Sequence, residues 1–312
     1  MNKSEIINYY WAPINKMFLP ASLQVQICLP FFLIPNFYFL MVAMTNESIK
    51  KRTWLRNAML YFPIIILTTG FVTLAIQFLY LSTYFSGGLM NVELCSVLRT
   101  TQAFLRALVA SSPFIFSVFR YMRVFYKIRY DTLIAVILML FLNGITLVSV
   151  IVNFFSPMSA SIHLNDEVCT YMRIFKSNAI ATSVEVLAFS VPIVCPILGV
   201  LINILFLHKL RMQTCDSGSA NTSRVNRSVA INLMCNSIEP FLAQFPSTLY
   251  FILTDQNTKS SFIVWRLIDG LTCFSYAFST IASIILIKDI RQIYVEHKRY
   301  ALASVSKMFH SD

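Results

Sequence analysis

The sequence predicts an all-α membrane protein, a bundle of seven membrane-spanning helices. The 312-residue chain is 57% hydrophobic and only 12% charged, about half the charged share of a soluble globular protein. Seven apolar stretches fill most of it, and each has the about 20 residues that a helix needs to cross ~30 Å of hydrocarbon. The basic residues gather after every second stretch, as they do in proteins that cross a membrane several times.

The seven stretches are joined by short connections, which leave no room for a soluble catalytic or binding domain. Residues 64–81 and 133–155 are apolar on every side, whereas a helix of a soluble protein keeps a polar face. The first stretch begins near Leu23 and lacks a small-residue cleavage site, so we interpret it as a span and not as a signal peptide. We expect one seven-span domain, with spans at about 22–45, 58–84, 95–119, 132–154, 177–207, 228–253 and 262–287.

The placement of charge predicts the orientation of the chain. The net charge is +11, and 17 of the 25 lysines and arginines follow the first, third, fifth and seventh spans. Because basic loops stay in the cytoplasm, we expect the tail 1–21 outside the cell and the tail 288–312 inside. An odd number of spans also requires the two ends to lie on opposite sides. The basic surface is then a rim that faces membrane lipid, and not a nucleic-acid groove.

Two cytoplasmic segments have distinctive patterns. The third inner loop, 215–228, is rich in Ser, Asn and Thr, which favours a mobile connection. After the last span, Ile287, Ile290 and Ile293 recur at helical spacing between charged residues. This pattern favours a short amphipathic helix on the inner leaflet, with a frayed extension of the last span as the alternative.

Two of the seven cysteines are placed to form a disulfide. Cys95 lies at the outer mouth of the third span, and Cys169 lies in the long outer loop before the fifth. Both are then on the oxidising side of the membrane, whereas the other five lie inside spans or in the reducing cytoplasm. A disulfide would fix the loop to the helix end. Two unpaired thiols are the alternative.

Phe119, Arg120 and Tyr121 lie at the cytoplasmic edge of the third span. Arg120 follows Cys95 by 25 positions, or roughly 37 Å of helix. In this spacing the chain resembles the rhodopsin-like G-protein-coupled receptors, which have an Asp/Glu-Arg-Tyr motif at this distance below a loop-linked cysteine. The resemblance implies that Arg120 holds the inner ends of the bundle closed and then, with Tyr121, meets the G protein. The alternative is an ordinary arginine of the inner side.

The chain departs from this family at three places. Phe119 replaces the acidic residue, the second span has no Asp for the family's sodium site, and residues 278–284 replace Asn-Pro-x-x-Tyr. With these departures the chain is similar to the nematode serpentine chemoreceptors, which have seven spans and about this length, and class U or V is the subclass we expect. The residues that carry this resemblance are Pro113, Arg120, Leu201-Ile-Asn203 and Lys209-Leu-Arg211.

Charged residues inside the spans are expected to face the bundle interior, because a charge in hydrocarbon costs at least ~2.5 kcal/mol. Arg106 lies roughly 16 Å from the outer side and Glu239 roughly 18 Å from the inner side. An ion pair between them is therefore a hypothesis, and Glu185 is a second partner for Arg106. Asp269 lies one turn below Arg266, where a local i,i+3 contact and a ligand-binding role are both open.

A small-molecule pocket is expected between the outer halves of the helices. For Tyr250 and Trp265, anchoring at the membrane interface is the alternative interpretation. Prolines in the fifth and sixth spans remove backbone hydrogen bonds and favour bends, which either let the inner end of the sixth span swing outward or are static kinks. The residues expected to line the pocket or to be buried polar neighbours of it are Gln102, Arg106, Glu185, Glu239, Tyr250, Trp265 and Asp269.

These features favour a chemosensory G-protein-coupled receptor. A small external ligand would bind between the outer helix halves and favour a state whose inner face opens to a heterotrimeric G protein. Such a receptor belongs in the plasma membrane, for which the ciliary membrane of sensory neurons is one setting. The expected partners are thus a small molecule, a G protein and membrane lipid, and no nucleic acid.

Two other functional classes fit the sequence less well. The main alternative is an odorant-receptor-type ligand-gated channel or a small-molecule transporter. Insect odorant channels have the N-terminus inside, however, and the two halves of this chain lack the internal repeat of many transporters. A membrane enzyme has little support, because the four histidines lie outside the span interiors and His-Glu-x-x-His is absent. We therefore expect no enzymatic activity, no metal and no cofactor.

Overall fold

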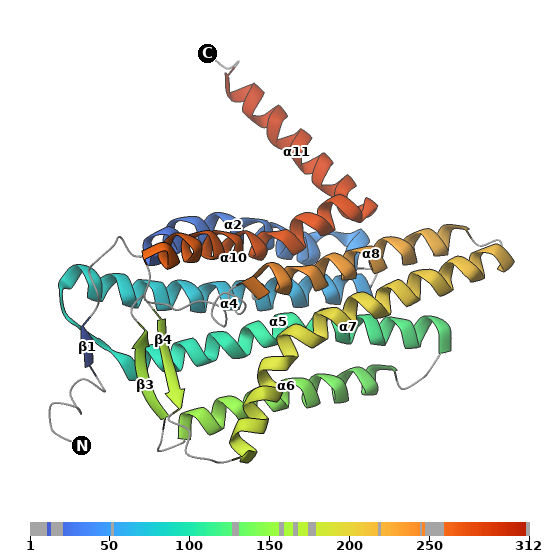
Figure 1. The fold of residues 1–312 in the computed structure, drawn as a ribbon. Helices are drawn as coiled ribbons and strands as arrows, with labels where there is room; N and C mark the ends of the chain where they lie inside the picture. The colour runs from blue at the N-terminus through green and yellow to red at the C-terminus, as the bar shows by residue number, and fades with distance from the viewer. Residues whose placement is uncertain are drawn as a thin grey trace.

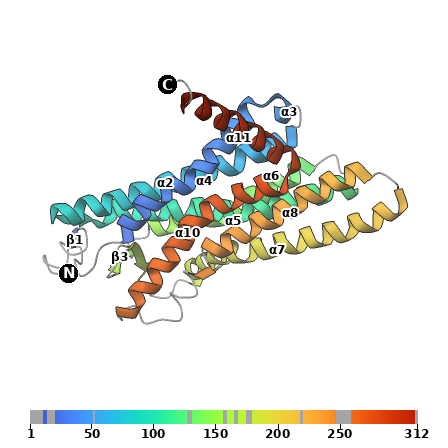
Figure 2. The same cartoon turned by 90° about the horizontal axis from the view of Figure 1, so that it is seen from above.

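The structure is a computed structural model, and it describes most of the chain. The described residues are 11–13, 21–50, 53–126, 131–155, 159–164, 168–173, 179–217, 220–243, 245–246 and 259–309. Within them, seven long helices lie side by side in one bundle (Figures 1 and 2). They are α2 (Ala21–Thr45), α4 (Thr53–Ser86), α5 (Val92–Tyr126), α6 (Asp131–Phe155), α7 (Ala179–Ser217), α8 (Ala220–Ala243) and α10 (Lys259–Leu286).

Each of the seven helices overlaps one of the expected spans. Five of the described helices contain a segment long and apolar enough to cross a membrane, while α6 contributes a shorter apolar stretch, Val136–Ile151. Part of the expected sixth span, 247–253, lies outside the described residues. The five segments are Ser22–Thr45, Leu60–Ser86, Thr101–Tyr126, Val186–Met212 and Arg266–Leu286.

The connection between α7 and α8 differs from the mobile loop expected at 215–228. Helix α7 continues to Ser217 and α8 begins at Ala220, so most of this polar segment is helical. In Figure 1 the joined ends of the two helices extend beyond the ends of α5 and α6. Helices α7 and α8 pack against one another, and composition alone therefore predicted a longer loop than the structure has.

Two small antiparallel ladders, which the sequence analysis did not predict, lie at one end of the bundle (Figure 1). Strand β1 (Trp11–Pro13) pairs with β2 (Leu89–Asn91), with Trp11 opposite Asn91. Strand β3 (Ser159–Leu164) pairs with β4 (Val168–Arg173), and both contact α5. Gly87, with φ of 68°, adopts the left-handed conformation that turns the chain from α4 toward β2. We call this the strand end of the bundle, and the opposite end the α11 end.

The bundle is apolar outside and partly polar inside, the arrangement expected of a protein surrounded by lipid. Large apolar side chains point outward, for example Phe31, which is 68% exposed, and Leu140, which is 69% exposed. Between α2 and α4 the helices approach closely: a Cβ atom on Gly70 would lie 2.7 Å from a methyl carbon of Leu33. Glycine at this position leaves room for the side chain of Leu33.

A separate helix, α11 (Lys288–Phe309), follows α10 and leaves the bundle in a new direction (Figures 1 and 2). It is longer than the short amphipathic helix that the sequence predicted, and it is not a straight extension of α10. Ile287, Ile290 and Ile293 are buried in one cluster with side chains of α2 and of the short helix α3 (Glu47–Lys50). The apolar face read from the sequence thus packs on the bundle, and its contact with lipid stays a prediction.

Candidate functional site

A network of hydrogen bonds crosses the centre of the bundle and begins at Asn36 on α2. The side chain of Asn36 is fully buried. Its Nδ2 donates to the carbonyl oxygen of Tyr276 on α10 at 2.8 Å, and its Oδ1 accepts from Thr280 Oγ1 at 2.6 Å. The amide is therefore satisfied by groups of the neighbouring helix, which ties α2 to α10.

The network continues from α10 to α4 and α5. The hydroxyl groups of Tyr276 and Thr73 lie 3.2 Å apart, and Gln102 Nε2 donates to Thr73 Oγ1 at 2.6 Å. Gln102 is 1% exposed. This residue was predicted to line a pocket, and the structure places it at a junction of α4, α5 and α10.

The segment that replaces Asn-Pro-x-x-Tyr provides hydroxyl groups instead. On α10, Ser279 Oγ donates to Asn236 Oδ1 at 3.0 Å, and Ser283 Oγ donates to Asn232 Oδ1 at 2.9 Å. Both asparagines lie on α8. With Thr280 bonded to α2, this stretch of α10 links the two helices on either side of it.

Helices α5, α7 and α8 meet at a close approach. Asn203 Nδ2 on α7 donates to Ser117 Oγ on α5 at 2.7 Å. One turn away on α7, a Cβ on Gly199 would lie 2.7 Å from Ser237 Oγ of α8 and 3.4 Å from the backbone of Phe114. Glycine at position 199 is therefore required for this packing. Helix α7 also bends along its length (Figure 1), and the prolines at positions 192 and 196 provide the physical reason.

A second polar cluster lies nearer the strand end of the bundle. The thiol of Cys273 on α10 is within electrostatic range of Asp269, of Arg106 on α5 and of Cys28 on α2. Arg106 and Asp269 are both half-buried. The structure therefore brings these two predicted pocket residues, which carry opposite charges, into one region of the bundle.

The predicted ion pair between Arg106 and Glu239 is not formed among the described residues. Glu239 lies on α8 and is 6% exposed, and burial is the only influence on its carboxyl group that the structure records. Depth along the helices had suggested the pair.

Five predicted site residues lie wholly or partly outside the described residues. Tyr250 lies outside the described residues, and so do the side chains of Glu185 on α7 and Trp265 on α10. Cys95 is in the first turn of α5 and Cys169 is on β4, a strand that contacts α5. The side chains of both cysteines are outside the described part, and the disulfide between them stays a prediction.

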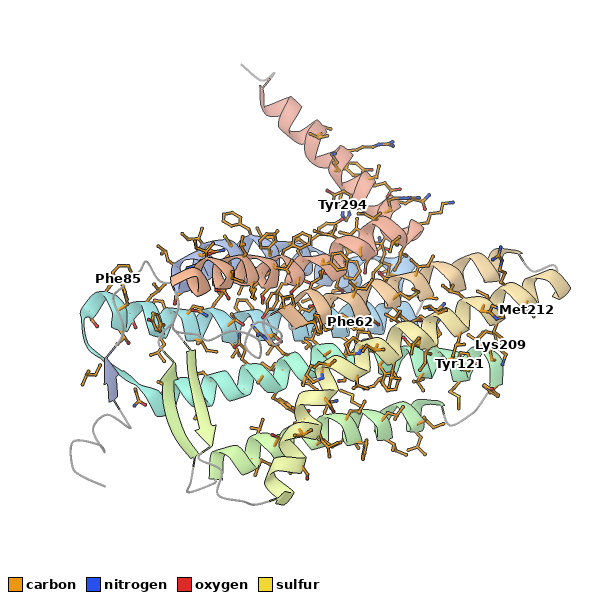
Figure 3. All side chains as sticks on the ribbon, in the orientation of Figure 1. Phe62, Phe85, Tyr121, Lys209, Met212 and Tyr294 are labelled. Carbon is orange, nitrogen blue, oxygen red and sulfur yellow. The ribbon has the colours of Figure 1, made fainter. Side chains whose placement is uncertain are left out.

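Arg120 lies near the α11 end of α5 and is 7% exposed. Its guanidinium carbon is 5.3 Å from the ring centroid of Phe206 on α7. Tyr121, the neighbouring predicted residue, is half-buried and packs against the cluster formed by Phe206, Leu210 and Ala230. The two residues thus lie where α5 meets α7, and Figure 3 shows Tyr121 close to this contact.

Comparison with protein families gives no match, and neither does comparison with the sequences of curated proteins. Among solved structures, the crystal structure of squid rhodopsin is similar, with a TM-score of 0.61. The sequence identity is 12%, and the match covers 93% of this chain and 85% of the rhodopsin chain. The fold is that of a rhodopsin-like seven-helix bundle. This confirms the predicted fold class, and a rhodopsin-like bundle is a multi-pass membrane architecture.

Several residues of this rhodopsin-like bundle were not singled out from the sequence. The buried partners Thr73, Tyr276, Asn232 and Asn236 had no motif. Lys209 was noted as a positive charge of the inner side and as part of the Lys209-Leu-Arg211 pattern, without a contact partner. One signal was available: an asparagine, serine or threonine inside an apolar span needs a partner. The helix on which the partner lies could not be read from the sequence.

Proposed function

We propose that this chain is a chemosensory G-protein-coupled receptor of the plasma membrane, similar to the nematode serpentine chemoreceptors. The N-terminus is outside and the C-terminus is in the cytoplasm, so the strand end of the bundle is the outer end and the α11 end is the inner one. The ciliary membrane of a sensory neuron is the setting that fits such a role. A small external ligand binds near the outer end, and a heterotrimeric G protein binds at the inner end.

The observation that carries this proposal is the position of Arg120 within a rhodopsin-like fold. The arginine lies near the inner end of α5, 25 residues beyond Cys95, and it is covered by Phe206 of α7. An arginine that is buried between two helix ends becomes accessible when those ends separate. Such a group is suited to report a change of bundle shape to a protein on the cytoplasmic side.

The ligand is proposed to bind beside Arg106 and Asp269. These two groups, on α5 and α10, lie within electrostatic range of Cys273, and they offer both signs of charge to a polar molecule. Gln102 is one turn from Arg106 on α5 and is bonded to Thr73. A ligand that binds better when α5 and α10 are displaced shifts the population toward the open inner face.

The experiment is expression of the chain with a promiscuous G protein, followed by a calcium assay against volatile and water-soluble metabolites. We expect a response that Arg120→Ala abolishes while surface expression is preserved. Arg123→Ala is the matched control, because Arg123 is an exposed arginine on the same helix that lies over Phe119 of its own helix at 5.9 Å.

Two results would contradict the proposal. One is a ligand response that is equal in the Arg120→Ala chain and the unmodified chain at equal surface amounts. The other is a ligand-gated current in oocytes that persists when G proteins are blocked, which is the behaviour of a channel.

A further inference from the structure

The inner ends of α5 and α7 are joined by a lysine that lies among aromatic rings. The Nζ atom of Lys209 on α7 is 4.7 Å from the ring centroid of Tyr126, 4.8 Å from that of Phe125 and 5.5 Å from that of Tyr121. All three rings belong to α5. We call these four residues the lysine cage, and Figure 3 shows two of them, Tyr121 and Lys209, side by side.

The geometry is that of a cation–π contact between two helices. An ammonium group within about 6 Å of a ring centroid is attracted by the negative face of the ring, and the attraction grows when water is partly excluded. Lys209 is half-buried, and Phe125 also contacts Phe206, with 5.2 Å between the ring centroids. The contact therefore favours the arrangement in which the end of α7 lies against α5.

The cage is coupled to the covering of Arg120. Phe206 and Lys209 are three residues apart on α7, so they lie on the same face of the helix. Phe206 lies over the guanidinium of Arg120, while Lys209 enters the cage. A displacement of α7 that uncovers Arg120 must therefore also withdraw Lys209 from the rings.

The cation–π contact of the neighbouring basic residue lies within a single helix. Arg123 lies over Phe119, 5.9 Å from its ring centroid, and both residues belong to α5. This contact is local and leaves the relative position of α5 and α7 unchanged. Among the cation–π contacts of the described residues, those of Lys209 and Arg120 are the ones that connect α5 with α7.

We propose that the lysine cage is a lock that holds the inner ends of α5 and α7 together in the inactive receptor. The proposal rests on the proposed receptor function. It adds the contact that stabilises the inactive state at the inner end of the bundle. Activation withdraws Lys209 from Tyr121, Phe125 and Tyr126, and this movement uncovers Arg120. Phe119 stands in place of the acidic residue that precedes the arginine in the resembling family, and the proposed lock instead uses the rings of Tyr121, Phe125 and Tyr126 on the same helix.

The first test measures ligand-free nucleotide exchange on a G protein in membranes, per receptor at the surface. Lys209→Met keeps the length of the side chain and removes its charge. We expect it to raise basal exchange about three- to tenfold, because the inactive state loses the cation–π contacts of Lys209 with the three rings. Lys209→Arg keeps the cation, so its basal exchange should stay near that of the unmodified chain. Lys298→Met, which removes an exposed charge on α11, should have no effect.

The second test separates cation–π attraction from simple packing. Phenylalanine analogues with one, two and three ring fluorines are incorporated at Phe125, which weakens the negative ring face in steps while keeping the ring shape. Basal exchange should rise with each fluorine. Equal basal exchange across the series, in receptors of equal surface amount, would overturn the lock.

The third test needs no G protein and therefore distinguishes failure of the lock from failure of the proposed function. Spin labels are attached to Arg123→Cys on α5 and Met212→Cys on α7, both exposed positions, and the parent chain gives the background of native cysteines. Lys209→Met should shift the distance between the labels to longer values, and Lys209→Arg should not. Longer distances without any G-protein activation would support the lock and contradict the receptor function. Unchanged distances would overturn the lock, whether or not the chain signals.

Discussion

Replacing Asn36 by alanine should weaken the attachment of α2 to α10. The fully buried amide makes two hydrogen bonds to α10, one to the carbonyl oxygen of Tyr276 and one from the hydroxyl of Thr280. Side-chain hydrogen bonds between membrane helices contribute ~0.6 kcal/mol on average and up to ~1.7 kcal/mol each. Two of them predict a loss of about 1–3 kcal/mol in the free energy of unfolding.

The assay is thermal unfolding in detergent, followed with a dye that fluoresces on reaction with thiols. Cys195 and Cys273 are buried, so the dye reacts as the bundle opens. The expected fall in Tm is about 2–10 °C, on the scale of a few degrees per kcal/mol for a chain of this size. Thr68→Val is the matched control, because its exposed hydroxyl bonds only within α4 in the described structure.

A double-mutant cycle with Thr280→Val isolates the bond between the two side chains. The double variant should lose less stability than the sum of the two single variants, by about 0.6–1.7 kcal/mol. Strict additivity, or an Asn36→Ala variant whose Tm stays within about 1 °C of the unmodified chain, would refute the reasoning.

Three further predictions follow from the packing and from the orientation. Gly199→Ala should cost about 1–3 kcal/mol through its contact with Ser237 Oγ, and adding Ser237→Ala should restore much of the lost Tm; no recovery would contradict the contact. Ile290→Asp, at a position 1% exposed, should release α11 and speed its hydrogen exchange, whereas Gln292→Asp on the exposed side should not; equal exchange would contradict the packing. An epitope tag after Asp312 should react with antibody only in permeabilised cells, and reaction on intact cells would reverse the orientation.

The positions of the seven helices could be predicted because long apolar runs leave the backbone few alternatives in lipid. The span expected at 95–119, for instance, falls within α5. The strands β3 and β4 could not be predicted, since six-residue segments in a polar loop show too little alternation of polar and apolar residues. The extension of α7 to Ser217 was missed because that prediction relied on the polar composition of the segment alone.

The sequence predicted how deep the site residues lie in the membrane, but not the helix face on which each side chain lies. Arg106 and Glu239 were placed at compatible depths by counting residues, yet a helix turns by about 100° per residue, and the sequence does not give the face that each side chain takes. Asn36 was recognisable as a polar group needing a partner, but Thr280 and Tyr276 became its partners only once α2 and α10 were seen side by side. The lysine cage likewise became visible only once α5 and α7 were seen side by side.

The two adjacent residues Ser279 and Thr280 have a mechanical consequence. One bonds to α8 and the other to α2, and neighbouring positions on a helix point about 100° apart. Rotating α10 about its own axis would stretch both bonds together, whereas tilting it along with α2 and α8 stretches neither. A molecule that binds beside Asp269 and displaces α10 should therefore tilt the helix as a rigid body. Rotation of α10 about its own axis would cost more free energy.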